Sequence, residues 1–172
     1  MNRKKQKFVF PILLCLLLTA CSNRFAKQEY HSNKKIAQME DHYAKENSVF
    51  HPIDGGYSFT VSKFDGRQTL WNKKLRKKQN LKIDISFQLT EGQAKIVHIN
   101  NKGNVTTLIE CSSKTSTERP ITKTVTLERG QNRLKIVGYD CKNIDLKILF
   151  TEPDSFSQAN NEIAQDFYSL KL

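Results

Sequence analysis

The chain has 172 residues, of which 28 are Lys or Arg and 17 are Asp or Glu, so its formal net charge is +11 at pH 7. This length supports one domain with a modest hydrophobic core and argues against several domains. A basic surface is attracted to anionic lipid headgroups or anionic polymers, and the alternative is a solvated lysine-rich surface without a ligand.

The chain opens with a basic segment followed by a short apolar one. Residues 1–7 read MNRKKQK, and residues 8–18 form an apolar run of 11 residues. A membrane-spanning helix needs about 20 apolar residues, so this run is too short to cross a bilayer. The pattern is typical of a secretory signal peptide, and a short buried core helix is the alternative.

The signal segment ends with Leu18, Thr19, Ala20 and Cys21. An aliphatic residue, two small residues and a cysteine in this order resemble the lipobox of bacterial lipoproteins. The resemblance implies that the Cys21 thiol takes a diacylglycerol, that a peptidase cuts between Ala20 and Cys21, and that the new amino terminus is open to acylation, for example by palmitate. Two acyl chains suffice for stable anchoring. We therefore expect a signal peptide over 1–20 and a mature chain anchored on the extracytoplasmic side of the cell membrane.

Removal of the signal peptide leaves 152 residues and lowers the formal charge from +11 to +7, since four basic residues are lost. Two cysteines remain beyond the anchor, Cys111 and Cys141. Disulfides persist outside the cytoplasm, and a bridge here would close a loop of about 30 residues, worth roughly 3–4 kcal/mol. Two free buried thiols are the alternative. An exported, lipid-anchored chain is a poor candidate for nucleic-acid binding.

Residues 21–50 are polar and contain no Gly or Pro. Ile36, Met39 and Tyr43 recur at i, i+3 and i+7, which is a weak helical pattern. We expect a lipid-anchored, partly helical tether that lifts the domain off the membrane. The alternative is a partner-binding helix face.

Period-two alternation begins near residue 57 and continues to about residue 150. In LKIDISFQL, residues 81–89, apolar and polar residues alternate strictly, which predicts a half-buried strand. Turns with Gly, Asn or Asp separate further short strands, which favours an all-β, antiparallel β-sandwich or barrel over 51–152. We expect two three-stranded meanders, joined by the polar link 112–120 and packed as two sheets. The expected strands lie at 81–89, 94–99, 105–111, 121–127, 133–138 and 144–150.

The segment ERGQNRLKIVGYDCKNIDLKILF, residues 128–150, resembles the last strands of jelly-roll ectodomains. In these domains a Gly-x-Asn turn, here Gly130 and Asn132, precedes a short strand, a turn and a closing strand. The resemblance implies a jelly-roll-like sandwich and assigns no binding residue.

The tail 153–172 leaves the β-pattern at Pro153. Ile163, Phe167 and Leu170 lie at i, i+4 and i+7, which predicts a short C-terminal helix that packs on the sandwich. A partner-docking helix is the alternative.

Catalytic chemistry has little support in the sequence, which contains no HExxH, GxSxG or P-loop motif. His51 and Asp54, in HPIDGG, suit a hydrolytic or metal site, but a turn explains the same residues. His98 lies in a strand, where a structural histidine is the default. We therefore expect a chain that is not an enzyme and holds no cofactor or metal.

Binding is the better-supported role. Small β-sandwiches stack aromatic rings on the apolar C–H faces of sugars, and the candidate ligand-binding residues are Trp71, Tyr57 and Tyr139. Trp71 lies in QTLWNKKLRKK, among basic residues, where it suits an anionic glycan. The alternative is that Trp71 fills one end of the core.

The whole chain resembles small surface lipoproteins of low-GC Gram-positive bacteria. We expect non-catalytic binding of cell-wall glycan or anionic polymer. An accessory or inhibitory subunit that docks another cell-envelope protein through 33–47 or 153–172 is the alternative. A third hypothesis, an exported hydrolase, requires His51 or His98 beside a carboxylate in a cleft.

Overall fold

The computed structural model describes residues 24–151, so the expected signal peptide, the anchor at Cys21 and the tail 153–172 lie outside the described residues. No helix among the described residues has the length and apolar character needed to span a membrane. A helical segment over 24–30 comes first. The labelled elements then follow in the order α2 (Asn33–Ile36), β1 (His42–Ile53), β2 (Gly56–Leu75), β3 (Gln79–Gln88), β4 (Glu91–Ile99), β5 (Val105–Ser112), β6 (Thr117–Leu127) and β7 (Gly130–Thr151).

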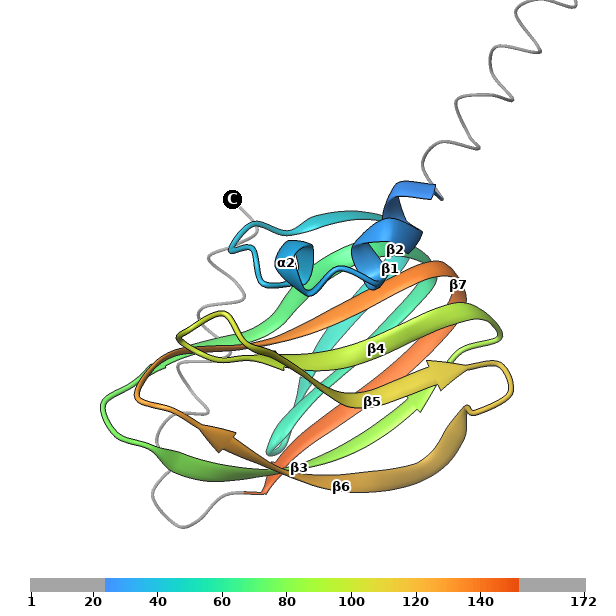
Figure 1. The fold of residues 1–172 in the computed structure, drawn as a ribbon. Coiled ribbons are helices and arrows are strands. Elements are labelled where there is room, and N and C mark those ends of the chain that lie inside the picture. The colour runs from blue at the N-terminus through green and yellow to red at the C-terminus, as the bar shows by residue number, and fades with distance from the viewer. Residues whose placement is uncertain (1–23, 152–172) are drawn as a thin grey trace, which may run out of the picture.

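The strands form an antiparallel β-sandwich of jelly-roll type, as the alternation predicts (Figure 1). The long strands β2 and β7 pair with each other over almost their whole length and contribute to both layers. In one layer the second half of β7 pairs with β3, which pairs with β6. In the other layer the first half of β7 pairs with β4, which pairs with β5.

The strand order corrects the predicted pair of meanders. Strands β3 and β4 follow each other in sequence but belong to different layers, and β6 pairs with β3. The second predicted meander is also wrong at the segment YDCKN, which we predicted to be a hairpin turn and which lies within β7. Asp140 and Asn143 have φ values of 54° and 49°, and these left-handed residues bend one continuous strand instead of reversing it.

The core lies between the layers and is built from the inward positions of the alternating strands. All the apolar residues of the strict alternation over 81–89 are at most 4% exposed. Burying one such side chain contributes about 1.5–3 kcal/mol before conformational entropy is subtracted. The largest fully buried aromatic side chains are Tyr57, Phe59, Phe64 and Phe87.

The expected tether is wrong for the part that the structure describes. Residues 42–53 form β1, which pairs with β2 from His42 opposite Arg67 to Ile53 opposite Gly56. The sandwich therefore begins about ten residues earlier than expected.

The segment before β1 packs on the outer face of the layer that contains β4 (Figure 1). Ile36 is fully buried there and forms a second apolar cluster with Tyr30, Val97, Ile99 and Val137. The expected stripe is therefore not a common face, because Ile36 is buried whereas Met39 is 60% exposed.

Candidate binding surfaces

Two buried cations hold the N-terminal segment on the sheet. The Lys135 ammonium donates to the carbonyl oxygen of Gln38 at 2.8 Å and lies 3.1 Å from the Asp41 carboxylate. The Arg133 guanidinium donates to the carbonyl oxygens of Gln38 and Ala37, each at 2.7 Å. Burial lowers the pKa of both cations, and the Asp41 charge opposes this effect. Charged groups are buried only when they are paired and hydrogen-bonded, so we assign this pair to structure.

A third buried cation, Arg67, extends the contact toward the helical segment. Arg67 donates to the Gln38 side chain at 2.7 Å and forms an ion pair with Glu29. The same Glu29 carboxylate lies 3.1 Å from the Nδ1 atom of His42. We call Arg67, Arg133 and Lys135 the cation clamp. Because all three are committed to the chain itself, they are not available to an external anion.

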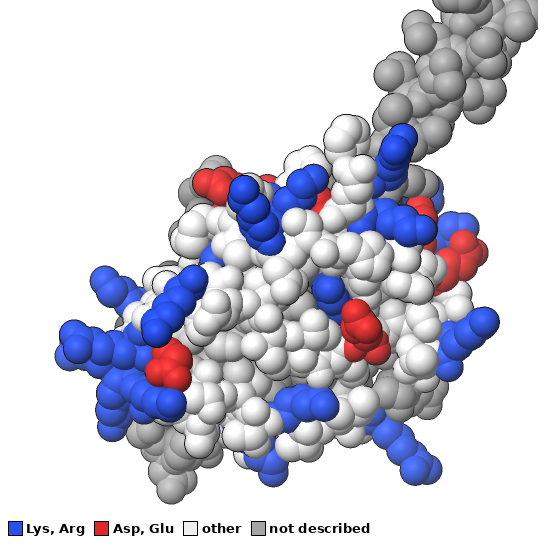
Figure 2. All heavy atoms as spheres, in the orientation of Figure 1, with Lys and Arg blue, Asp and Glu red and all other residues white. Residues whose placement is uncertain are grey.

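A group of exposed cations lies at one end of the sandwich, which we call the basic end (Figure 2). The β2–β3, β4–β5 and β6–β7 connections meet there. Leu75 at the end of β2 pairs with Gly130 at the start of β7. The side chain of Asn101, between β4 and β5, donates to the carbonyl oxygen of Arg129, between β6 and β7, at 2.7 Å. The basic end consists of the exposed residues Lys74, Arg76, Lys77, Lys78, Lys102 and Arg129, and the half-buried Lys73 lies next to Lys74 in β2.

One cation of the basic end is paired with a carboxylate among residues 24–151. Lys78 forms an ion pair with Glu128 at 2.9 Å, with the lysine side chain 64% exposed. Lys74, Arg76, Lys77 and the other loop cations are exposed to solvent. A group of like charges on one convex end produces a positive potential that attracts polyanions. The sequence shows the run around residue 76, but only the fold adds Lys102 and Arg129 to it.

Two of the predicted ligand-binding aromatics are in the core, so their assignment as binding residues is wrong. Trp71 is 3% exposed and Tyr57 is 1% exposed. Both rings pack around Phe150, with ring centroids 6.2 Å and 6.0 Å away. A buried ring has no face to offer to a sugar. Trp71 instead packs in the core, which is the alternative stated above.

The third predicted aromatic, Tyr139, lies half-buried beside the helical segment. Its ring meets the Tyr30 ring edge-to-face at 5.1 Å, and the Lys27 ammonium lies 5.6 Å from its centroid. Its hydroxyl donates to Gln93 at 2.8 Å. Intramolecular contacts therefore occupy much of Tyr139.

The histidines named in the sequence do not form the site that a hydrolase requires. His98 is buried, and its Nε2 atom lies 3.0 Å from the Asn132 side-chain oxygen. His51 is exposed on β1. Neither pairs with a carboxylate within residues 24–151, and the same range contains no cluster of metal-ligating side chains.

The predicted disulfide is absent, because Cys111 and Cys141 are separate buried thiols. The Cys111 thiol donates to the carbonyl oxygen of Phe87 and the Cys141 thiol to that of Gln93, each at 3.2 Å. Burial, followed by the nearby Asp65 charge, raises the pKa of Cys141 to about 12. The thiols act as small hydrophobic groups with weak hydrogen bonds, which was the alternative to the bridge.

One cleft was not predicted at all. It has a volume of about 410 Å³ and lies between the helical segment, the start of β1 and the bulge of β2. Its rim carries two exposed aromatic side chains, Phe25 at 57% and Tyr43 at 42% exposure. The remaining lining residues are Ala26, His42, Ala44, Asp65 and Gly66. Phe25 had no sequence signal other than its position shortly after the expected anchor.

No protein-family model matches the chain, and no curated protein matches it. Among solved structures, the carbohydrate-binding module CBM6cm-2 from Cellvibrio mixtus lichenase 5A in complex with cellotriose is 17% identical, with a TM-score of 0.37 over 67% of this chain and 95% of that chain. A family 35 carbohydrate-binding module from an environmental isolate is 13% identical, with a TM-score of 0.35 over 68% of this chain and 88% of that chain.

An exo-β-1,3-galactanase from Phanerochaete chrysosporium with galactose is 14% identical, with a TM-score of 0.36 over 65% of this chain. The match spans 29% of the galactanase chain. Likenesses with TM-scores this low carry no inference about what the chain binds.

Proposed function

We propose that this chain is a lipid-anchored, non-catalytic surface lipoprotein of a bacterial cell membrane that binds an anionic polymer of the cell envelope through its basic end. The lipobox-like residues 18–21 support the anchor. The observation that carries the binding role is the basic end itself, where three connections bring six exposed cations together and Glu128 pairs with one of them, Lys78. Arginine and lysine side chains suit the phosphate or carboxylate groups of such polymers.

Stacking on a neutral glycan has less support than charge-driven binding. The predicted stacking residues Trp71 and Tyr57 are buried, and Tyr139 is engaged by Tyr30 and Lys27. The alternative of an accessory or inhibitory subunit has no specific observation in its favour, since Ile36 of the expected docking stripe is buried in the domain itself.

The test is co-sedimentation with isolated cell-wall sacculi, before and after acid stripping of their covalently attached anionic polymer. We expect the chain to bind intact sacculi. This binding should weaken between about 0.1 M and 1 M salt, because the screening length falls from about 10 Å to 3 Å. Undiminished binding to stripped sacculi would contradict binding to the anionic polymer and would favour binding to the glycan itself.

A charge-reversed variant locates the surface. Lys74→Glu, Arg76→Glu and Lys77→Glu together should weaken binding at least about tenfold, because each basic residue near an anionic surface contributes about 1 kcal/mol. The matched control reverses three exposed lysines elsewhere, Lys82→Glu, Lys114→Glu and Lys147→Glu. Equal losses in both variants would mean that net charge alone drives adhesion.

A further inference from the structure

We infer that the cleft rimmed by Phe25 and Tyr43 is the membrane-facing surface of the domain, and that both rings contact the interfacial region of an anionic phospholipid bilayer. This inference rests on the lipid anchor in the proposed function and adds the orientation of the domain. We call Phe25, Tyr43 and the cleft between them the aromatic rim.

The length of the chain places the aromatic rim close to the bilayer. Phe25 follows Cys21 by four residues, and an extended chain spans at most about 3.6 Å per residue, so the two Cα atoms lie within about 14 Å of each other. The headgroup region on one side of a bilayer is about 5–7 Å thick. A chain acylated at Cys21 therefore cannot carry Phe25 far beyond the headgroups.

The cation clamp fixes the N-terminal segment to the sheet, and so it also fixes which side of the domain lies near the anchor. The segment between the anchor and β1 is fixed to the sheet by Arg133 and Lys135, through the carbonyl oxygens of residues 37 and 38. Ile36 adds a fully buried apolar contact. The domain is thus held by its own N-terminal segment and is not separated from the membrane by a free tether.

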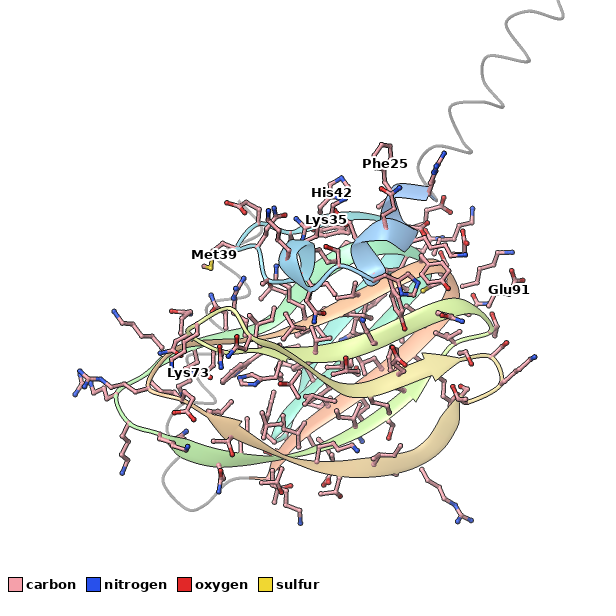
Figure 3. The ribbon with its side chains drawn as sticks, in the orientation of Figure 1. Phe25, Lys35, Met39, His42, Lys73 and Glu91 are labelled. Atoms are coloured by element: carbon pink, nitrogen blue, oxygen red, sulfur yellow. The ribbon has the colours of Figure 1, made fainter. Side chains whose placement is uncertain are left out.

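The chemistry of this side suits a lipid interface. Aromatic side chains favour the boundary between headgroups and acyl chains. Arg24 and Lys27, on the same helical segment as Phe25, are exposed and suit anionic headgroups. Figure 3 places Phe25, Met39, His42 and Lys35 on the same side of the molecule, and Phe25 and Met39 are the two most exposed large apolar side chains among the described residues.

The basic end lies elsewhere, since Figure 3 shows Lys73 at a different end of the sandwich from Phe25. Contact with the bilayer through the aromatic rim therefore leaves the basic end open to polymer. The two surfaces belong to one domain and take different ligands.

The experiment uses Phe25→Trp and Tyr43→Trp in the full-length chain, expressed in bacteria, purified with its lipid and reconstituted into vesicles of phosphatidylglycerol and phosphatidylcholine. Brominated phospholipids quench tryptophans that reach the bilayer. The only native tryptophan, Trp71, is 3% exposed and gives a constant background. Ile121→Trp, on β6 in the opposite layer, is the control because Ile121 is also exposed, at 37%.

We expect added quenching and a blue-shifted emission in Phe25→Trp and Tyr43→Trp, and neither change in Ile121→Trp. Mass spectrometry of Cys21 is read separately. If Cys21 carries acyl chains but all three variants emit alike, the orientation is overturned and the anchor stands. If Cys21 carries none, the anchor is overturned and this inference falls with it, while binding to sacculi remains a separate question.

Discussion

The ammonium of Lys135 lies 2.8 Å from the carbonyl oxygen of Gln38, 97 residues away in sequence, and no part of the lysine side chain is exposed. A buried cation that satisfies backbone carbonyl oxygens joins two segments firmly, because removing one partner leaves the other buried without that hydrogen bond. This contact makes residues 24–41 part of the domain.

Removing this cation should loosen the N-terminal segment. Lys135→Met keeps the length of the side chain but removes the ion pair with Asp41 and the hydrogen bonds to the carbonyl oxygens of Gln38 and Glu40. Breaking one side of a buried pair costs about 3–5 kcal/mol, so the free energy of unfolding should fall by that order in urea titrations. Lys147→Met is the control, because Lys147 is exposed and should change stability by less than about 0.5 kcal/mol. Similar losses in the two variants would contradict the role of the clamp.

The sequence predicts the strands best where one face is buried and the other is wet. The alternation over 81–89 became β3 because every second side chain enters the core. The N-terminal segment failed as a prediction because it is held by Lys135 and Arg133, whose long-range partners are backbone oxygens that no local pattern reveals. The second predicted meander failed because a bend at Asp140 looks like a turn in sequence.

The two thiols should be unreactive in the folded chain. Cys111 and Cys141 are each 2% exposed, and burial raises the pKa of both, so little reactive thiolate forms at neutral pH. Alkylation without reductant, followed by peptide mass spectrometry, should modify neither cysteine in buffer and both in about 6 M urea. Two unmodified cysteines in urea, modified only after reduction, would show that they are bridged.

Stability should depend on pH through His98. Burial lowers its pKa although the hydrogen bond to Asn132 opposes this, so the unfolded chain binds the proton more readily than the folded one. The stabilising contribution is therefore complete above the unfolded pKa of about 6.5 and is lost as pH falls below it. The melting temperature should drop between about pH 7.5 and pH 5.5, and His98→Gln should reduce that drop. Parallel pH profiles for the two proteins would count against this assignment.

Gly66 allows β1 to approach β2 closely. Its φ is +105°, and a Cβ atom there would lie 2.1 Å from the carbonyl oxygen of His42. Gly66→Ala should destabilise the chain by more than the 1–2 kcal/mol that a left-handed conformation alone costs. Gly103→Ala is the control, with φ +79° and its nearest atom, the Cβ atom of Ala37, at 3.9 Å. Equal losses of unfolding free energy would mean that the backbone clash has no effect.

The candidate site was predictable only in part. The basic run near Trp71 is visible in the sequence, but the sequence does not show that Trp71 itself is buried against Phe150. Lys102 and Arg129 join the run only because their loops meet at the same end of the sandwich. Surfaces assembled from separate loops depend on topology, and the topology that we predicted from local patterns, two three-stranded meanders, was wrong.

The most direct measurement is a nuclear magnetic resonance titration of residues 21–172, with Cys21→Ser, against the purified anionic polymer stripped from cell walls. We expect chemical-shift changes confined to the amides around residues 73–78, 102 and 129, and we expect these changes to weaken as salt rises. Changes centred on Tyr139, or on the outer face of β3 and β6, with none at the basic end, would contradict binding through the basic end.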